Sequence, residues 1–151
     1  MSHWLLKSEP DVYSIQDLKR DGSTEWEGVR NYQARNFLRD QIKKGDLVFF
    51  YHSNSEPSGI AGIAKVVKEG FPDASAWNKK SPHYDPRSSQ EKPVWYAVQI
   101  KFIKAFKTLI DLQMLRSAAE LNQMGLLKRG QRLSVQPVRE SEWKHILKMT
   151  A

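Results

Sequence analysis

The sequence predicts an α+β fold, in which a mixed, partly antiparallel sheet curls into a small β-barrel with short helices at its sides. The clearest evidence is a run of strand periodicity, in which Val94, Tyr96, Val98, Ile100 and Phe102 alternate with polar or mixed neighbours. The other apolar segments are short, and brief helical patterns separate them. They form too few complete βαβ units for a doubly wound parallel sheet.

The N-terminal part of the chain predicts one strand and two helix starts. The apolar residues 4–6 predict a buried strand. Ser14 and Asp17 have the spacing of a capping box and predict a helical turn. A second helix is expected with Asn31 as its N-cap. Its apolar positions follow a helical period: Ala34, Phe37, Leu38 and Ile42.

The remaining elements alternate between strands and short helices. Residues 47–52 and 60–67 predict two strands. Residues 68–93 are rich in Pro, Ser, Asp and Lys and lack periodicity, and a connection of this length is usually functional or disordered. Residues 108–119 predict a short helix, and residues 133–136 predict a last strand. A C-terminal helix is expected to bury one face, made of Trp143, Ile146 and Leu147.

Length and composition indicate one folded domain spanning residues 1–151. Hydrophobic residues make up 40% and charged residues 27%, which is close to the globular average. The absence of cysteine excludes disulfides, thiolate catalysis and cysteine-based zinc sites. Neither a signal peptide nor an apolar run of membrane-spanning length is evident. We therefore expect a protein without a membrane partner, located in the cytoplasm, or in the nucleus of a eukaryote.

The charge balance indicates a possible class of partner. Lys and Arg number 24 against 17 Asp and Glu, giving a net charge of +7. Nucleic acid is the commonest reason for such an excess, since neutralised phosphates release counterions. A generically basic, solvated surface is the alternative, and the charge alone does not decide between them.

Three polar clusters are candidate binding residues. The densest lies in residues 26–36 and places Trp26, Arg30, Asn31, Tyr32 and Arg35 around a glycine at the mouth of a predicted helix, with Arg39 one turn beyond Arg35. Alternatively, these residues are a core tryptophan, a helix cap and a solvated basic face. The other two clusters follow strands and could instead be a polar loop and an exposed strand face. They are Tyr51, His52, Ser53 and Asn54, and Ser134 with Gln136.

Catalytic and cofactor patterns are weak. The four histidines show no metal-ligand spacing, and the chain carries no nucleophile elbow and no phosphate-binding glycine motif in the right context. We therefore expect no metal and no cofactor. Lys7 and Glu9 lie two residues apart and would face the same way on a strand, which leaves an acid–base pair open.

Several motifs, taken together, resemble the EVE domain of the PUA-like superfamily, in particular its branch of bacterial and eukaryotic proteins related to thymocyte nuclear protein. The resemblance rests on segments that occur in the same order along essentially the whole chain. These segments are WLLKSEP at residues 4–10, WEGVRNYQARN at 26–36, FYHSN at 50–54, GIAGIA at 59–64, YDP at 84–86 and LSVQPV at 133–138.

The resemblance implies a PUA-like β-barrel flanked by short helices, and a binding function rather than catalysis. The fold is similar to that of YTH domains, which hold a methylated base in an aromatic cage. By position, Trp26 would form one wall of such a cage, with Tyr32, Tyr51, Trp77 and Tyr84 as candidates for the others. The implied base pocket comprises Lys7, Ser8, Glu9, Trp26, Val29, Asn31, Tyr32, Tyr51, His52, Ser53, Asn54, Ser134 and Gln136.

The hypothesis from sequence is therefore a non-catalytic reader of a modified base in DNA or RNA, with Arg30, Arg35 and Arg39 on the phosphates. An alternative is an ASCH-like hydrolase of a modified nucleobase or nucleoside, in which Lys7, Glu9 and Tyr51 would act. A protein-interaction module with an incidental basic face is a third possibility. The sequence does not specify the modification, the type of nucleic acid or the oligomeric state.

Overall fold

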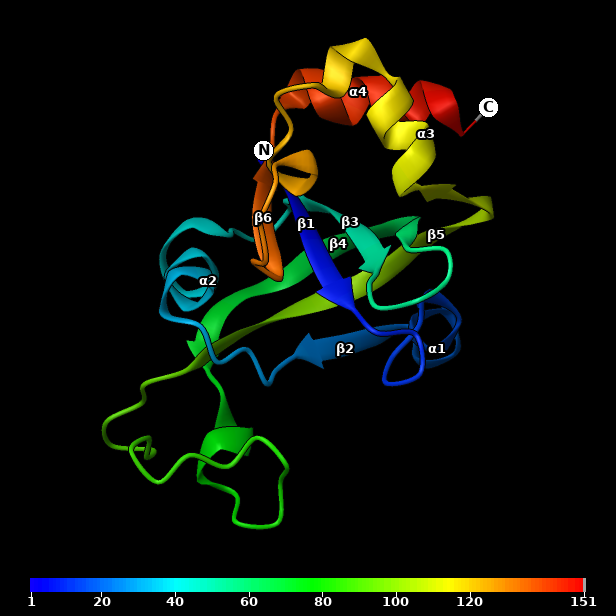
Figure 1. The fold of residues 1–151 in the computed structure, drawn as a ribbon. Coiled ribbons are helices and arrows are strands. Elements are labelled where there is room, and N and C mark those ends of the chain that lie inside the picture. The colour runs from blue at the N-terminus through cyan, green and yellow to red at the C-terminus, as the bar shows by residue number, and fades with distance from the viewer. Residues whose placement is uncertain (151) are drawn as a thin grey trace.

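The computed structural model describes residues 1–150 and contains one mixed sheet of six strands (Figure 1). Their order across the sheet is β2-β5-β4-β3-β1-β6. β1 and β3 pair in parallel, and the other neighbours pair antiparallel. The strands are β1 (His3–Ser8), β2 (Ser23–Trp26), β3 (Leu47–His52), β4 (Gly59–Pro72), β5 (Tyr96–Asp111) and β6 (Val135–Val138).

Short helices surround the sheet. They are α1 (Ile15–Asp21), α2 (Tyr32–Asn36), which continues into a π-helical turn (Phe37–Gln41), α3 (Leu112–Ser117) and α4 (Glu140–Met149). Single 3₁₀ turns occupy Ala74–Trp77, Ala119–Leu121 and Gly125–Leu127. The predicted caps are confirmed, because the Ser14 hydroxyl accepts from Asp17 N and the Asn31 side chain accepts from Ala34 N. Within residues 1–150 no helix has the length and apolarity needed to cross a bilayer.

The predicted mixed sheet with short helices at its sides is confirmed, but the predicted barrel is wrong. The sheet is strongly bent, but β2 and β6 are its two edges and pair with β5 and β1 rather than with each other. The long strands β4 and β5 carry several register shifts along their shared ladder. Such bulges bend and twist a strand pair, so the sheet curls without closing.

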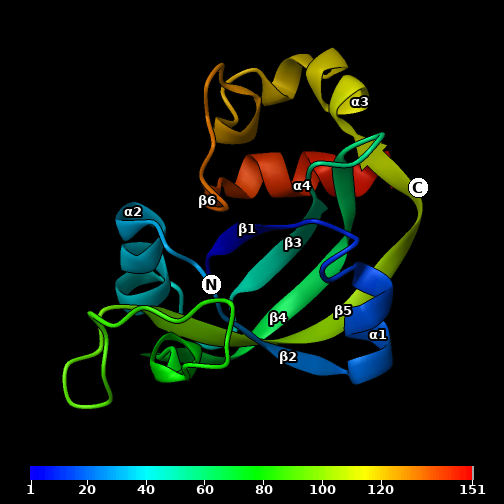
Figure 2. The same ribbon diagram turned by 60° about the horizontal axis from the view of Figure 1, so that its bottom comes forward.

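Two apolar clusters lie on opposite faces of the sheet. Figure 2 shows α3 and α4 together on one side of the sheet. Alternation along β1 sends Trp4 and Leu6 to one face and Leu5 to the other. α1 and α2 contribute Leu18 and Ala34 to the first cluster. α3 and α4 cover the second face, where the ring of Trp143 stacks on Phe49 with centroids 3.7 Å apart.

Several element boundaries differ from the sequence expectation. β4 continues to Pro72, so residues 68–72 belong to a strand paired with β5 rather than to the predicted connection. Residues 108–111 belong to β5 rather than to a helix, because they pair with the start of β4, and α3 begins only after Asp111 caps it. The strand β2 is absent from the prediction. The last strand is shifted to Val135–Val138, with Pro137 inside it at the sheet edge. In α4, Trp143 and Ile146 are buried as expected, whereas Leu147 is exposed.

Candidate functional site

A cavity of about 460 Å³ opens where the C-terminal ends of β1 and β2 meet the long loop after β4. This volume lies within the usual range for small-molecule sites. The cavity brings together part of the sequence-predicted pocket, namely Lys7, Ser8, Glu9, Trp26, Val29 and Ser134, and it also includes Arg30, which was predicted to contact phosphates. Its other lining residues are Val12, Tyr13, Thr24, Glu25, Glu27, Gly28 and His83.

Trp26 is both a wall of this cavity and part of the core. It is the last residue of β2 and is 8% exposed. Its ring meets Phe50 edge-on with centroids 5.4 Å apart, in the cluster that also holds Leu6 and Val29. The core therefore fixes the orientation of the ring that the cavity presents.

His83 is a lining residue that the sequence interpretation misses. Its imidazole lies directly over Gly28, where an added Cβ would come within 2.6–2.8 Å of ring atoms. Gly28 also has φ +84°, a conformation that other residues rarely adopt. Only glycine allows this close approach, so the WEGV motif and the loop histidine form one unit. The only available clue in the sequence was the length of the aperiodic segment that contains His83.

A buried ion pair holds this unit in place. The Arg30 Nη1 atom lies 3.0 Å from Asp73 Oδ2, with side chains 24% and 0% exposed. Asp73 also accepts from Gly28 N at 2.8 Å and from Ser75. Arg30 Nη2 in turn donates to the His83 carbonyl at 2.6 Å. The network therefore ties the loop bearing His83 to the segment bearing Trp26.

The balance of effects on Asp73 favours its charged form. Burial by itself would raise the pKa of this carboxyl, but hydrogen bonds from Ser75, Gly28 and Arg30 outweigh burial and lower it. The carboxylate of Asp73 thus compensates the positive charge of Arg30 inside the protein. Its guanidinium also lies 5.4 Å from the centroid of the Trp95 ring. These contacts fix the Arg30 side chain at the wall of the cavity.

The polar groups around the mouth of the cavity are mostly carboxylates and hydroxyls. The Ser8 hydroxyl donates to the Tyr13 carbonyl at 2.7 Å, and the Glu9 carboxylate accepts from Asn54 Nδ2 at 2.9 Å. Desolvation raises the pKa of Glu27, with a further contribution from Asp73, although the residue as a whole is exposed. Carboxylates in such a place can accept hydrogen bonds from a ligand amino group.

The second predicted cluster mainly supports the fold around the cavity. Tyr51 is buried in the core on the opposite face of the sheet, and the Lys7 ammonium lies 5.7 Å from its ring centroid. Burial lowers the pKa of Lys7. His52 Nε2 accepts from Ile15 N at the start of α1, and Ser53 N donates to the Ser8 carbonyl.

The remaining predicted residues of the WEGVRNYQARN segment lie outside the cavity. Asn31 caps α2, and Tyr32 is 51% exposed and stacks on Trp95 at 4.9 Å. Arg35 donates to the Val94 carbonyl and lies 5.0 Å from the Tyr32 ring centroid. Arg39 pairs with its neighbour Asp40 at the surface. Trp77 and Tyr84, suggested as further walls, do not line this cavity either.

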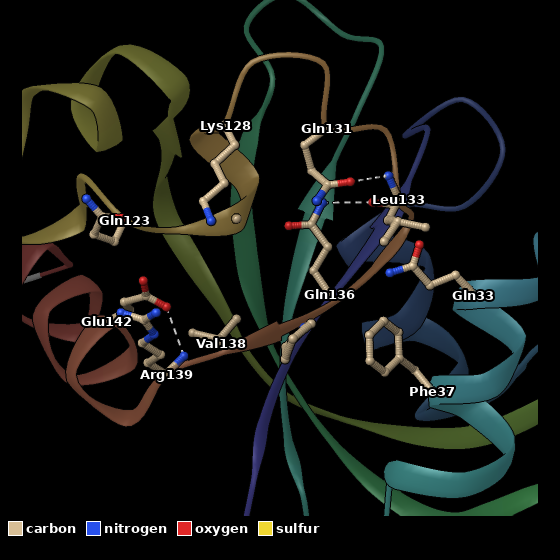
Figure 3. Close-up of a pocket in the computed structure, with 12 residues that line it drawn as sticks. Gln33, Phe37, Gln123, Lys128, Gln131, Leu133, Gln136, Val138, Arg139 and Glu142 are labelled. Carbon is tan, nitrogen blue, oxygen red and sulfur yellow. Dashed lines mark hydrogen bonds between the residues drawn. The ribbon is translucent and has the colours of Figure 1, made fainter.

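Gln136 lies in a different hollow. It lines a second cavity of about 330 Å³, between α2, β6 and the segment before it (Figure 3). Leu133 lines this second cavity, whereas the next residue, Ser134, lines the first. The third predicted cluster is therefore divided between two neighbouring sites.

The described residues do not assemble a metal centre or a joined acid–base pair. Within residues 1–150, no group of three or more His, Asp or Glu side chains is placed to hold a metal ion. The Lys7 ammonium faces Tyr51, whereas the Glu9 carboxylate binds Asn54 at the cavity mouth. Of the three groups proposed for hydrolysis, Lys7 thus lies near Tyr51, whereas Glu9 has a different partner.

Comparisons with known proteins show close relatives. A family model described as EVE domain matches residues 2–149. A solved structure from Pseudomonas syringae is 46% identical with a TM-score of 0.95, covering 99% of this chain and 100% of that chain. Human thymocyte nuclear protein 1 is 44% identical over 167 residues, which is 98% of this chain and 73% of the human protein.

Two further solved structures bear on the alternatives. The human THYN1 protein in complex with 5-methylcytosine containing DNA is 44% identical with a TM-score of 0.92, covering 99% of this chain and 98% of that chain. An ASCH protein from Zymomonas mobilis has a TM-score of 0.58 and covers all of both chains, but it is only 9% identical. That second likeness shows a shared fold and nothing about activity.

Proposed function

Because this chain belongs to the EVE domain family, as its motifs suggested, we propose that it binds nucleic acid and holds one modified base in the cavity lined by Trp26 and His83. The observation that carries the proposal is the cavity itself, which is lined both by a core-anchored indole and by a loop imidazole that lies over Gly28. The human relative was solved with DNA containing 5-methylcytosine. We therefore infer that 5-methylcytosine in DNA is the first base to test.

The lining of the cavity suits such a base. Stacking on an aromatic side chain contributes about 1–3 kcal/mol per base. Glu9, Glu25 and Glu27 line the cavity, and a carboxylate accepts from the amino group of cytosine. Val12 and Val29 offer apolar contacts to a methyl group. To enter, the base must leave its stack, which costs a few kcal/mol.

The positive charge of the chain supports backbone binding. Arg39 is exposed and pairs with the surface carboxylate of Asp40, whereas Arg35 is half-buried and donates to the Val94 carbonyl and the Asn36 side-chain amide. Phosphates could displace or join such weak surface contacts. Arg30 takes a different role in this proposal, since Asp73 already neutralises it. In this proposal Arg30 holds the loop that carries His83 in place and does not bind a phosphate.

Lys7 and Glu9 both line the cavity, but the Glu9 carboxylate binds Asn54, and this supports a reader rather than a hydrolase. In this proposal, modified nucleosides remain chemically unchanged after long incubation with the protein, and mass spectrometry checks this. Turnover that disappears in Lys7→Ala would overturn the reader and favour the ASCH-like alternative.

The proposal is tested by replacing His83, whose side chain lines the cavity while its carbonyl holds Arg30. His83→Ala keeps that carbonyl and removes one wall. His145→Ala is the matched control, because His145 lies on α4, pairs with Glu120 and does not line the cavity. We expect His83→Ala to weaken binding to a 5-methylcytosine oligonucleotide roughly 5- to 150-fold, the equivalent of one lost stacking contact.

Fluorescence anisotropy with modified and unmodified versions of one oligonucleotide gives the affinities. Thermal melting of the same preparations checks that both variants are folded. Equal affinities of the wild type, His83→Ala and His145→Ala for the modified oligonucleotide would contradict the proposed pocket.

A further inference from the structure

The second cavity, with Gln136 at its wall, has the features of a built binding site. Its apolar side comes from Phe37, Leu133 and Val138, and its polar side is dominated by glutamine amides. Lys128 extends its side chain into the same hollow (Figure 3). A concave surface that combines an apolar wall with a few convergent polar groups is typical of a ligand site.

The backbone of Leu133 fixes two of these amides. Leu133 N donates to Gln131 Oε1 at 3.1 Å, and Gln136 Nε2 donates to the Leu133 carbonyl at 2.9 Å. These bonds determine which end of each amide remains available. Gln131 is left with its Nε2 donors and Gln136 with its Oε1 acceptor.

Gln136 Oε1 is the stronger evidence for a ligand site, because Gln136 is only 3% exposed. Buried polar atoms almost always have a hydrogen-bond partner. No group of residues 1–150 is found donating to Gln136 Oε1, yet the atom is not sealed off from solvent. It lies beside Gly125, where an added Cβ would be 3.4 Å away. A nearly buried acceptor therefore faces the cavity without a protein partner.

We propose that this cavity binds a second, unmodified nucleobase, adjacent in the strand to the base held by Trp26. The Gln136 oxygen accepts from an N–H on the base edge, and Gln131 Nε2 donates to the neighbouring ring nitrogen or carbonyl. Phe37 provides the apolar wall. Lys128 and Arg139 neutralise the adjoining phosphate. The assignment to one strand rests on the proposed function above.

The position of the two cavities favours neighbouring nucleotides. Leu133 and Ser134 are consecutive in the chain, and each lines one of the cavities. The backbone there is held firmly, since the Ser134 carbonyl accepts from Lys7 N at 2.9 Å. A strand that crosses this segment can place one base on each side. The protein would then select the base that flanks the modified one.

Gln131→Glu tests the site while preserving its anchor. A glutamate can still accept from Leu133 N, but it presents an acceptor where the amide presented donors. Gln113→Glu, on the exposed face of α3, adds the same charge elsewhere. Affinities are measured for oligonucleotides that carry 5-methylcytosine next to each of the four bases, on either side.

We expect the wild type and Gln113→Glu to distinguish the flanking bases by about 5- to 150-fold, as a pair of hydrogen bonds to one base edge does. Gln131→Glu should lose that preference while melting at the wild-type temperature. Equal affinity of the wild type for all flanking bases would overturn the second site. So would a preference that Gln131→Glu leaves intact.

A second measurement is independent of the Trp26 pocket. Side-chain amide resonances of Gln131 and Gln136 are followed by NMR while the four deoxynucleoside monophosphates are added to the wild-type protein. Shifts of both amides with at least one nucleotide support the site, and no shift with any of them contradicts it. If these amide resonances shift but the protein binds the modified and unmodified oligonucleotides equally, the proposed function is wrong while the second base site is supported.

Discussion

Trp26→Ala is expected to destabilise the protein as well as impair binding. Only 8% of the residue is exposed, and its ring packs edge-on against Phe50 within the core. Truncating a core tryptophan costs about 3–5 kcal/mol. For a domain of this size, each kcal/mol corresponds to roughly 2–4 °C, so the melting temperature should fall by about 6–20 °C. Wall and core are alternatives in the sequence interpretation, but the structure gives Trp26 both roles.

Thermal melting by far-UV circular dichroism measures this loss. Trp77→Ala is a useful comparison, because Trp77 lies in a 3₁₀ turn and belongs to neither core cluster. Binding is then measured well below the melting temperature of the variant. There, Trp26→Ala should lose the preference for the modified base and keep salt-dependent backbone binding. A melting temperature within about 2 °C of the wild type would refute the packing argument.

Three further perturbations test other parts of the account. Asp73→Asn leaves Arg30 without its anionic partner. Breaking a buried ion pair costs about 3–5 kcal/mol, so the melting temperature and the modified-base preference should both fall. An unchanged melting temperature would contradict a structural role for this ion pair. Burial lowers the pKa of His52 below its ordinary value of 6.5. Below pH 6.5 the unfolded chain therefore binds a proton at His52 more readily than the folded protein does. The free energy of unfolding should decline as the pH falls from 6.5 toward the pKa of His52 in the folded protein. His52→Gln keeps an acceptor for Ile15 N and should flatten this part of the melting profile, whereas parallel profiles would refute the assignment. For Arg35→Gln, the log–log salt slope of oligonucleotide binding should decrease by about 0.7–0.9, and an unchanged slope would remove Arg35 from the phosphate contacts.

Local features were predictable from the sequence because neighbouring residues decide them. The caps at Ser14 and Asn31 depend on residues three positions away. The extension of β5 to Asp111 was not predictable in this way. It depends on pairing with Gly59, where an added Cβ would approach the Ile110 carbonyl to 2.4 Å. Contacts between distant segments overrode the helical pattern there.

The same division applies to the candidate site. Trp26 and Ser134 were found from motifs and do line the cavity. His83 was missed because its position depends on Arg30, 53 residues earlier in the chain. The pairing of Arg30 with Asp73 likewise spans 43 residues. An arginine that the sequence predicts on a phosphate can therefore also have a carboxylate partner that no local pattern reveals.

A crystal structure with a 5-methylcytosine oligonucleotide would test the central claim most directly. The account expects the modified base outside its stack, in the cavity lined by Trp26 and His83, with the adjacent base beside Gln131 and Gln136. A modified base that remains stacked in the duplex while the protein contacts only the backbone would contradict it.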